Sequence, residues 1–465
     1  MEVKLVGTNV ELEPLLGLVR DEAQALLSPE PIAAAYARIS RSTKSVSALR
    51  DEARANVDKA RRSNRNIVFE MGHASIAEHA VFNFDLEGLS RLAIEEVQRS
   101  RLASYTERSQ RYVLIGEDFH LPDEVRGAGC EVEFRRVMAL LFDGYREVYE
   151  GLLSYWQCQG KGAGEPTPAQ WRDWEVFAKE DARYLLPLAT TGQLGMTLNA
   201  RSLAAMARRL KGSHLAETRA VGKALVEGAV AVAPSLVRYT EPTAADGVLA
   251  EPLIGPWQLG ERTAPGEVRL LHVTPEAEAL LASAAAVVQG RGGMEDSIMA
   301  WGGRHESGPS LAERYYQVAD CHAAAPRLFE LVDLSFEMSC SAACFGQLKR
   351  HRMATLLAQP YHLGIRVCVP PSVTAAGLES RFRQLAGEAG AAVEQLKGQL
   401  GDAAAYLLTN AHCRSVIVKT NLRELYHLAR LRMDLHAQWE IRTLTGRMVA
   451  LAQAELPQSG AFLCG

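Results

Sequence analysis

Apolar side chains recur along this chain with the spacing of amphipathic helices. Leu92, Ala93 and Val97 follow Leu89 by three, four and eight residues, which would place them on one face of a helix. The same spacing recurs in two later segments, at Leu203, Met206 and Leu210 and at Leu425, Leu428 and Leu431. Short runs of β-branched and aromatic residues predict strands at VKLV (3–6), AVFNFDL (80–86), RYVLI (111–115), VRLLHV (268–273) and IRVCV (365–369). The mixture predicts an α+β fold with helices packed on a modest β-sheet.

Segments from the first half of the chain are repeated, in the same order, in the second half. VKLV (3–6) resembles VRLL (268–271), RSRLAS (99–104) resembles RHRMAT (350–355), and NARSLAAMARRLKGSH (199–214) resembles NLRELYHLARLRMDLH (421–436). Tyr184-Leu-Leu also matches Tyr406-Leu-Leu. Chance similarity among helices rich in Ala, Leu and Arg is the alternative, but ordered matches favour a tandem duplication.

Glycine and proline mark the boundaries of the two copies. Residues 241–266 contain Pro242, Pro252, Pro256 and Pro265 and predict a linker, so the expected domains are 1–240 and a shorter copy at 267–465. Two Gly-rich stretches, 157–168 and 290–308, predict loops.

Composition and charge narrow the class of protein. The 465 residues are 48% hydrophobic and 23% charged, as in globular proteins, and the net charge of −4 gives no overall field for a nucleic acid polymer. The eight cysteines form no CxxC pair or zinc-site spacing, so no metal is expected. No apolar run is long enough to cross a membrane, and the charged first residues do not resemble a signal peptide. A cytoplasmic location fits best.

Arginines gather beside Ser, Glu and His in the absence of a dinucleotide-binding, Walker A, GxSxG or HExxH motif. The first cluster contains His73, Ser75, Glu78 and His79 and continues as RSRLASYTERSQRY (99–112). Arginine and serine side chains suit phosphate oxygens, although a solvated helix face with internal Glu–Arg pairs explains the charge pattern equally simply. For the histidines, a hydrogen-bonded structural role is favoured over metal binding.

At these residues the chain resembles a known family. The pattern GHxSxxEH followed by RxRxxSxxExSxRY is similar to the signature of the flavin-dependent thymidylate synthases, in which RHR is followed after seven residues by Ser. Copy one has Arg99-Ser-Arg101 and Ser109, and copy two has Arg350-His351-Arg352 but Pro360. Two later segments, ARYLLP (182–187) and 421–442, also resemble the family, so the likeness spans nearly the whole chain.

The resemblance implies reductive methylation of dUMP to dTMP. Methylenetetrahydrofolate would supply the carbon, FADH2 the hydride, and NADPH would re-reduce the FAD. Members of this family are homotetramers without a cysteine nucleophile. Because each chain here carries two units, the resemblance implies a homodimer that forms a pseudo-tetramer.

The residues that the resemblance assigns to the nucleotide divide between the copies. Copy one matches the phosphate-side set, namely Glu107, Ser109, Arg111 and Arg183, where copy two has Ala358, Pro360, His362 and Ala405. Copy two matches the base-side set, namely Gln347, Arg350 and the catalytic Arg432, where copy one has Glu96, Arg99 and Leu210, or Arg209 with a one-residue slip. This complementary loss suggests a composite site between the two copies.

For FAD the resemblance implies residues in both copies. These are His73, Ser75, Glu78, Arg99, Arg101, Asn199 and Arg201 in copy one, and His351, Arg352, Asn421, Arg423 and His436 in copy two. In copy two, His322, Ala324 and Arg327 align with His73, Ser75 and Glu78. Asn199 and Asn421 could instead be helix N-caps. The leading hypothesis is therefore a flavin-dependent thymidylate synthase. The alternatives are a paralogue that modifies C5 of another pyrimidine nucleotide, such as UMP, and a non-catalytic flavin- or nucleotide-binding protein.

Overall fold

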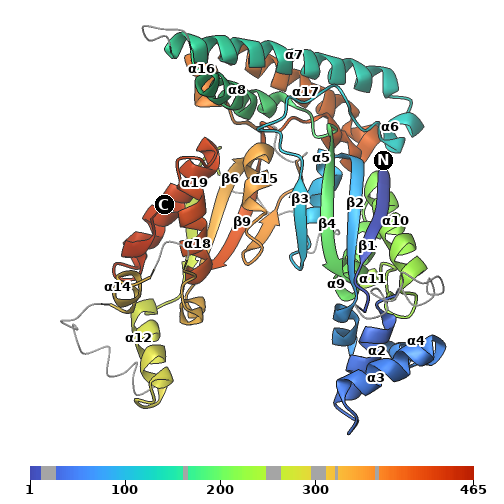
Figure 1. Cartoon of the computed structure of the whole chain (residues 1–465). Coiled ribbons are helices and arrows are strands. Elements are labelled where there is room, and N and C mark those ends of the chain that lie inside the picture. Colours follow the sequence, from blue (N-terminus) through green and yellow to red (C-terminus); the bar gives the residue numbers. More distant parts are fainter. Residues whose placement is uncertain are drawn as a thin grey trace. The chain divides into compact units, whose positions relative to one another are not determined.

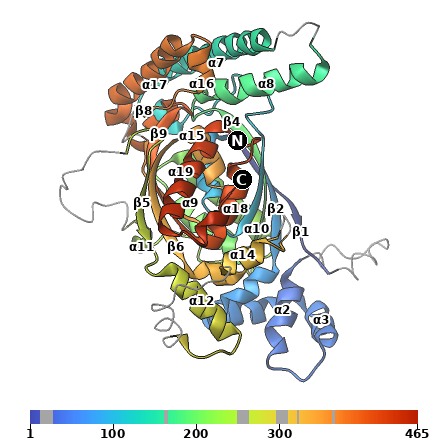
Figure 2. The same ribbon diagram turned by 90° about the vertical axis from the view of Figure 1, so that its left-hand side faces the viewer.

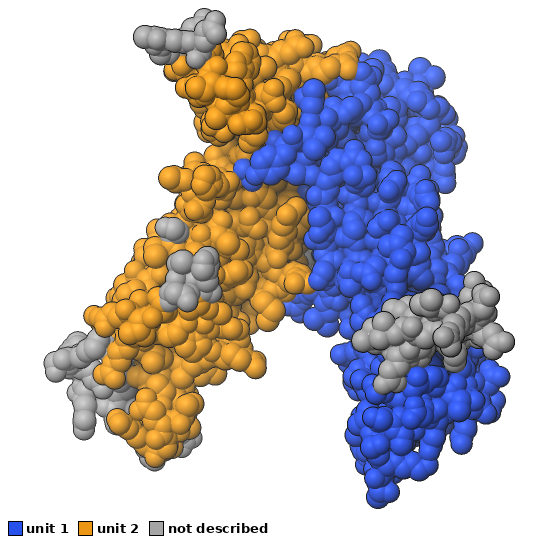
Figure 3. Space-filling view, in the orientation of Figure 1, with its two compact units in different colours: residues 1–142, 187–257, 391–407 blue, residues 143–186, 258–390, 408–465 orange. Residues whose placement is uncertain are grey.

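A computed structural model describes residues 1–11, 28–160, 166–247, 263–294, 310–319, 323–361 and 366–464. The chain forms two compact units, shown in different colours in Figure 3. Unit 1 comprises residues 1–142, 187–257 and 391–407, and unit 2 comprises 143–186, 258–390 and 408–465. Each unit thus contains a segment from the other half of the sequence. The division of the chain at 240 and 267 stays a prediction about where the repeats begin and end.

Unit 1 is built on an antiparallel sheet with the strand order β1-β2-β4-β3. Its strands are β1 (Glu2–Thr8), β2 (Val81–Ser90), β3 (Ala103–Glu107) and β4 (Thr191–Asn199). Phe82, Phe84 and Leu86 alternate with exposed residues along β2, so one face of the sheet is buried. Helices α9 (Ala200–Lys211) and α10 (Ala216–Val232) pack against the sheet and close the core (Figure 1).

Short helices complete unit 1. They are α2 (Glu30–Ile39), α3 (Val46–Ala55), α4 (Val57–Asn64), the π-helix η2 (Arg65–Glu70), the 3₁₀ helix η3 (Ala74–His79), α5 (Arg91–Gln98), α6 (Asp123–Gly127), α11 (Ala244–Gly247) and the 3₁₀ helix η8 (Gly401–Leu407). Helix α5 confirms the helix expected from Leu92, Ala93 and Val97, whereas Leu89 belongs to β2.

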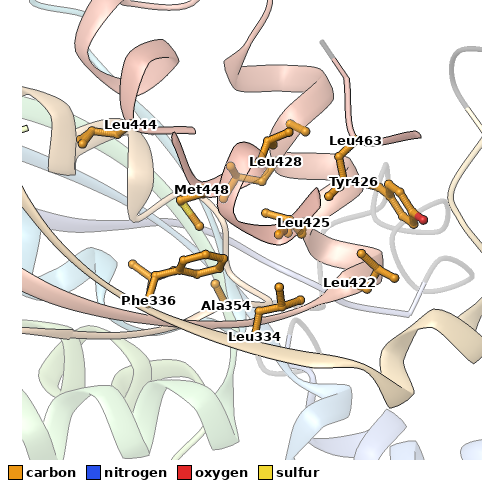
Figure 4. Close-up of a cluster of buried hydrophobic side chains, with 14 of the residues drawn as sticks. Leu334, Phe336, Ala354, Leu422, Leu425, Tyr426, Leu428, Leu444, Met448 and Leu463 are labelled. Atoms are coloured by element: carbon orange, nitrogen blue, oxygen red, sulfur yellow. The ribbon is translucent and has the colours of Figure 1, made fainter. Parts of the chain in front are cut away.

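Unit 2 repeats this plan. Its sheet has the order β5-β6-β9-β7, and a short β8 also pairs with β9. The strands are β5 (Val268–Val273), β6 (Asp333–Ser341), β7 (Thr355–Ala358), β8 (Arg366–Val367) and β9 (His412–Asn421). Helices α18 (Leu422–Arg432) and α19 (Trp439–Glu455) pack against this sheet (Figure 1, Figure 2). In the core, Phe336, Leu425 and Met448 are among the buried side chains that meet (Figure 4).

The remaining helices of unit 2 surround this core. They are α12 (Ala277–Val288), α14 (Leu311–Tyr316), η6 (Arg327–Leu331), α15 (Ala342–Leu348), α16 (Pro371–Ala375) and η9 (Gly460–Phe462), together with α8 (Pro168–Ala182) and η4 (Arg183–Leu185) from the first half of the chain. Two long helices, α7 (Glu131–Gln159) and α17 (Glu379–Leu400), cross the unit boundaries. Gly144 of α7 allows a close approach to α17, because a Cβ there would lie 2.4 Å from Leu385 Cδ1.

Strand pairing establishes which residues of the units correspond. Val81 pairs with Asn199 at the end of the β2–β4 ladder, and Asp333 pairs with Asn421 at the same end of the β6–β9 ladder. Both asparagines are helix N-caps, as expected from the alternative reading. The predicted mixture of helices and sheet is confirmed, and so are the strands at 3–6, 80–86 and 268–273.

Several predictions differ from the structure or lie outside it. The run 111–115 forms a turn and not a strand, because β3 ends at Glu107 and polar residues follow. Only Arg366 and Val367 of the run 365–369 are in a strand, and Ile365 lies outside the described residues. Much of the predicted linker and of both predicted loops, at 248–262, 161–165 and 295–309, also lies outside them.

In each unit a buried glutamate joins an N-cap serine to a tyrosine from the other half of the sequence. In unit 1, Glu217 accepts hydrogen bonds from Ser90 N and Oγ at 2.7 and 2.6 Å and from the Tyr406 hydroxyl at 2.7 Å. In unit 2, Glu440 accepts from Ser341 N at 2.9 Å, from Ser341 Oγ, and from the Tyr184 hydroxyl at 2.6 Å. Burial raises the pKa of Glu440 and of both tyrosines.

Candidate functional site

The C-terminal turn of α18 presents Arg432, the residue to which the resemblance assigns the chemical step. Asn421 begins the helix by accepting a hydrogen bond from the Glu424 N–H at 2.9 Å. Arg432 Nε donates to His351 Nε2 at 2.8 Å, and its Nη1 and Nη2 donate to the side-chain and backbone oxygens of Gln347, at 3.3 Å each. Unit 2 therefore brings together three predicted site residues, Arg432, Gln347 and His351.

His351 holds the Arg432 guanidinium in place as a neutral imidazole. His351 is buried, and burial lowers the pKa of its imidazole. The adjacent Arg432 cation lowers this pKa further. Because Nε2 accepts from Arg432, the ring proton lies on Nδ1, which donates to Glu424 Oε1 at 3.1 Å. Glu424, His351 and Arg432 thus form a hydrogen-bonded series. Sequence reasoning missed Glu424, whose position three residues after Asn421 indicated only helix capping.

Gln347 has a hydrogen-bond donor that the described residues do not satisfy. The side chain is buried in α15, and its carbonyl oxygen accepts from Arg432, but Nε2 has no partner in the described part of the chain. A buried, unsatisfied amide N–H is unfavourable unless a ligand or water accepts from it. The site therefore offers a fixed cation and a neutral donor side by side.

Other predicted residues lie near this turn with their side chains exposed. Arg350 and Arg352 immediately flank His351 and are exposed. His436 follows the end of α18, is exposed, and donates its backbone N–H to Asp434 Oδ1 at 2.8 Å.

Unit 1 has an arginine in the equivalent place, but a carboxylate neutralises it. Arg209 Nη2 donates to Glu96 O at 2.8 Å, as Arg432 Nη2 does to Gln347 O. It also donates to Ser100 Oγ, and Arg209 Nη1 pairs with Glu96 Oε2, both at 3.1 Å. Arg99 pairs with the same carboxylate at 3.1 Å. Burial lowers the pKa of Arg209. Both units therefore have an arginine here. The described side chain that it contacts is a carboxylate in unit 1 and an amide in unit 2.

This arrangement corrects the ungapped alignment of Arg432 with Leu210. Leu210 is fully buried in the hydrophobic core of unit 1 and offers no polar group to a ligand. Arg209, one position earlier, makes the contacts that Arg432 makes in unit 2. The one-residue slip is therefore the correct register at this point.

Three of the predicted phosphate residues lie together in unit 1. Glu107 ends β3, accepts from Gln98 Nε2 at 3.1 Å, and lies 3.6 Å from Arg91 Nη1. In the turn that follows, Ser109 Oγ accepts the Arg111 N–H at 3.2 Å. Serine and arginine side chains thus flank one short backbone turn.

Arg183, the fourth of this predicted set, lies in unit 2. It sits in η4, is buried, and donates from Nε to Glu180 O at 3.1 Å. Its neighbour Asp181 has its pKa raised to about 6 by burial, despite accepting hydrogen bonds from Ser372 Oγ and from Trp439 Nε1 at 2.9 Å. Arg183 therefore shares a unit with Gln347 and Arg432, and not with Glu107, Ser109 and Arg111.

The predicted flavin residues of unit 1 line an exposed 3₁₀ turn. His73, Ser75 and Glu78 are all exposed. Glu78 Oε1 pairs with Arg201 Nη1 at 2.6 Å, and Asn199, two residues before Arg201, caps α9 by accepting from Ser202 N at 2.8 Å. The two remaining arginines of this set, Arg99 and Arg101, follow α5 and are exposed.

Unit 2 retains the glutamate–arginine pair that the sequence alignment had not located. Glu330 precedes Asp333 by three residues, as Glu78 precedes Val81, and it pairs with Arg423 Nη1 at 2.8 Å. Glu330, and not Arg327, is thus the counterpart of Glu78, and His322 lies outside the described residues. Hydrogen bonds from Arg327 and Arg423 lower the pKa of Glu330. Arg423 Nε also donates to Ala325 O at 2.6 Å.

A cavity of about 600 Å³ lies beside this pair in unit 2. Asn421, Arg423 and Glu330 contribute its polar side, together with His427 and Arg430. The rings of Tyr316, Tyr426 and Phe462 line it, with centroids of Tyr316 5.0 Å from Tyr426 and 5.6 Å from Phe462. Aromatic walls with arginines suit a planar, anionic ligand.

Two kinds of feature are absent from the part of the chain that the structure describes. The described residues contain no group of three or more His, Cys, Asp or Glu that could hold a metal ion. They also contain no helix with the length and apolar character needed to span a bilayer.

A family model decides the relationship of the chain. The model described as thymidylate synthase complementing protein matches two successive regions, residues 24–235 and 269–458. This chain belongs to that family. The resemblance identified from the arginine motifs is confirmed, with the thymidylate synthase complementing family matched once in each half of the sequence.

Individual relatives match over part of their length. Flavin-dependent thymidylate synthases from Sulfurisphaera tokodaii, Clostridium tetani and Geobacter sulfurreducens are 31%, 28% and 35% identical over 37%, 39% and 29% of this chain. The chain spans 58%, 71% and 50% of those relatives.

Two solved structures are also similar. A UMP/dUMP methylase from Streptomyces cacaoi bound with 5-Br dUMP has a TM-score of 0.35 and 17% identity, covering 50% of this chain and 92% of its own. A flavin-dependent thymidylate synthase from Helicobacter pylori complexed with FAD and dUMP has a TM-score of 0.31 and 20% identity, covering 51% and 100%.

Proposed function

We propose that this protein methylates dUMP to dTMP in an FAD-dependent reaction that uses methylenetetrahydrofolate and NADPH. The observation that carries the proposal is the Arg432 guanidinium, which His351 and Gln347 contact beside a Gln347 amide nitrogen that the described residues leave without an acceptor. In unit 1 the equivalent Arg209 is paired with a carboxylate. Among the described contacts, a carboxylate therefore faces the arginine of unit 1, whereas an imidazole and an amide face the arginine of unit 2.

The chemistry proposed for Arg432 is electrostatic. A fixed cation at the uracil edge stabilises the N3 anion, which increases electron density at C5, where the new carbon bond forms. Gln347 Nε2 is a neutral donor suited to a uracil carbonyl. His351, kept neutral by burial and oriented by Glu424, holds the guanidinium without adding a second charge. Removing Glu424 therefore acts on the reaction through His351 and Arg432.

The residues present fit a flavin cofactor. The aromatic cavity of unit 2 has Arg423 and Asn421 on its polar side, and the Glu78–Arg201 pair of unit 1 repeats the Glu330–Arg423 pair. These groups would hold FAD, which supplies the hydride when bound. Asn199 and Asn421 use their side-chain oxygens as helix caps, so they would meet a ligand through the amide nitrogen.

We further propose that the nucleotide phosphate is held by Ser109 and Arg111 of copy one, so that residues of both copies serve one substrate. The support is chemical: a serine hydroxyl and an arginine flank one turn in copy one, whereas copy two has Pro360 and His362 at the corresponding positions. Two chains would supply the four units of a family tetramer. Light scattering of the flavin-containing protein tests this assembly, and a monomer at micromolar concentration would contradict it.

The decisive experiment measures tritium release from C5 of labelled dUMP, and of labelled UMP in parallel. FAD, methylenetetrahydrofolate and NADPH are present in each reaction. We expect release from dUMP that depends on methylenetetrahydrofolate. Release from UMP alone would identify another pyrimidine nucleotide as the substrate. Absence of release from both, in protein that binds flavin, would contradict the enzymatic proposal.

A further inference from the structure

Two cysteines of unit 2 meet where strand β8 pairs with strand β9 (Figure 2). Arg366 pairs with Cys413, and Cys368, just past the end of β8, donates its backbone N–H to Ala411 O at 2.9 Å. Because side chains alternate along paired strands, Cys368 and Cys413 lie on the same face. Cys413 Sγ lies 3.6 Å from the same Ala411 oxygen, so this thiol lies toward Cys368, with which it hydrogen-bonds.

The hydrogen bond between the two thiols gives them different chemical character. It lowers the pKa of the Cys368 thiol and raises that of Cys413, as expected when Cys413 donates and Cys368 accepts. Burial and the nearby Glu440 charge outweigh this effect at Cys368, so the pKa of Cys368 is raised overall. A base is therefore needed to ionise Cys368 at neutral pH, and the Glu440 carboxylate accepts a hydrogen bond from this thiol.

Cys368 is the accessible member of the pair. It is half-buried and lines a cavity of about 340 Å³, whereas Cys413 is buried. Glu440 lines the same cavity, and so does Arg447, which donates a hydrogen bond to Gly266 O. A partly exposed thiol beside a cation and a base can react with a small molecule, whereas a buried thiol is inert unless its partner reacts first.

Unit 1 shows that this fold does not require the two thiols. Thr191 is the counterpart of Cys413, because each pairs with the serine that caps the following helix. His120 is the counterpart of Cys368, since each donates its N–H at 2.9 Å to the alanine two residues before Thr191 or Cys413. His120 Nε2 also lies 3.7 Å from Glu217 Oε2, as Cys368 faces the buried glutamate of unit 2. Packing alone therefore does not explain a pair of cysteines in unit 2.

We propose that Cys368 and Cys413 form an oxidant-sensitive dithiol, which hydrogen peroxide entering this cavity converts to a disulfide. The inference does not depend on the proposed function. In a reducing compartment such a disulfide is transient, and reduction restores the two thiols.

The reaction has two steps. Glu440 takes the Cys368 proton, the sulfur attacks one peroxide oxygen, and the O–O bond breaks. The departing hydroxide takes the proton from Glu440 and leaves as water, so that Cys368 becomes a sulfenic acid. The Cys413 sulfur then attacks the Cys368 sulfur, and the displaced hydroxide leaves with the Cys413 proton as a second water. The two thiols together lose two electrons, and one peroxide gains them.

Peptide mapping of the flavin-containing full chain tests the pair. The protein is treated with hydrogen peroxide in the absence of NADPH, quenched with N-ethylmaleimide and digested without reductant. We expect two peptides joined through Cys368 and Cys413, lighter than the reduced peptides by two hydrogen atoms and separated by dithiothreitol. Recovery of both residues as thiols, over-oxidation of Cys368 without a link, or a link from Cys368 to Cys340 would overturn the inference.

Each thiol also has a variant that isolates its role. In Cys413→Thr, matched to Thr191 of unit 1, peroxide should leave Cys368 as a sulfenic acid that dimedone labels at least about tenfold more than in the wild type. Equal labelling, or no label in folded Cys413→Thr, would overturn the inference. In Cys368→Ser, Cys413 should survive peroxide as a thiol because it is buried, and its oxidation would overturn the assignment of Cys368 as the attacking thiol. If Cys413→Thr does not fold, Cys368→Ser decides.

Discussion

Both units have an arginine at this position, but the described groups that contact it differ in charge between the units. Arg432 is held by an amide and a neutral imidazole, whereas Arg209 is held by the Glu96 carboxylate. An ion pair in a partly buried place cancels most of the field that a ligand would experience. Gln347 in unit 2 and Glu96 in unit 1 therefore give the two described sites a difference of one charge at this position.

Replacing Arg432 should chiefly slow the reaction. Arg432→Ala removes the cation that stabilises charge developing at the uracil, and we expect kcat to fall by roughly 100-fold or more. Arg111→Ala should chiefly raise KM, because a phosphate contact is made equally before and during the reaction. Tritium release at varied dUMP concentration measures both. Unchanged turnover in Arg432→Ala would contradict its assigned role.

Glu424 offers a test of positioning. Glu424→Gln keeps the shape of the side chain but removes the carboxylate that fixes the His351 Nδ1 proton, so Arg432 should be held less firmly. We expect kcat to fall by about tenfold, with little change in KM, and the fall should be absent in an Arg432→Ala background. A loss that simply multiplies with that of Arg432→Ala would indicate a separate role.

His412 should make unit 2 sensitive to acid. It is fully buried, and burial lowers its pKa to about 4, whereas an unfolded histidine has a pKa of about 6.5. The unfolded state therefore takes up the proton first, and stability falls as the pH drops below about 6.5. From pH 7 to pH 5 this contribution falls by about 2 kcal/mol.

The matched variant His412→Asn isolates this contribution. Urea unfolding at the two pH values should show the wild type losing about 2 kcal/mol more than the variant. Asp181, whose raised pKa of about 6 gives stability that increases on acidification, is present in both proteins and cancels. Equal losses of stability in the two proteins would mean that His412 is not a buried, neutral imidazole.

At the level of helices and strands, regular patterns were predictable and registers were not. Alternation along β2 and the Asn caps of α9 and α18 follow from local chemistry, so the sequence indicated them. Arg208, Arg209 and Leu210 are adjacent, and only the burial of Leu210 in the core decides which residue faces the site. Glu330 was missed for a similar reason, since strand pairing and not local similarity places it opposite Arg423. The position of Arg183 could not be predicted, because no local sequence pattern shows which unit its segment joins.

The N-cap of α18 allows capping to be separated from cofactor binding. Asn421→Ala should lower stability by about 1 kcal/mol, because the Glu424 N–H loses its acceptor. Asn421→Asp keeps an acceptor and should keep this stability, but it removes the amide nitrogen that we propose for FAD. Fluorescence titration should therefore show weaker FAD binding in Asn421→Asp, and wild-type affinity would assign Asn421 to capping alone.

At the scale of the whole molecule, each unit contains a tyrosine from the opposite half of the sequence. This tyrosine donates a hydrogen bond to the buried glutamate of the unit. Tyr406→Phe removes a donor from Glu217, and Tyr184→Phe removes one from Glu440. Leaving a buried carboxylate with one donor fewer should destabilise each unit by about 2 kcal/mol. Thermal unfolding of the two single variants and of the pair measures this, with Tyr155→Phe as a control on α7. Wild-type melting in both variants would contradict it.

These shared tyrosines bear on how the gene could have changed after duplication. Deleting either repeat would remove a core side chain from the unit built mainly by the other, so neither repeat is free to disappear even after it has lost substrate groups. The degenerate repeat would be retained for folding while its former substrate residues drift, as at Pro360, which stands where copy one has Ser109. Cutting the chain between 247 and 263 should for the same reason give two fragments that are stable only when produced together in one cell.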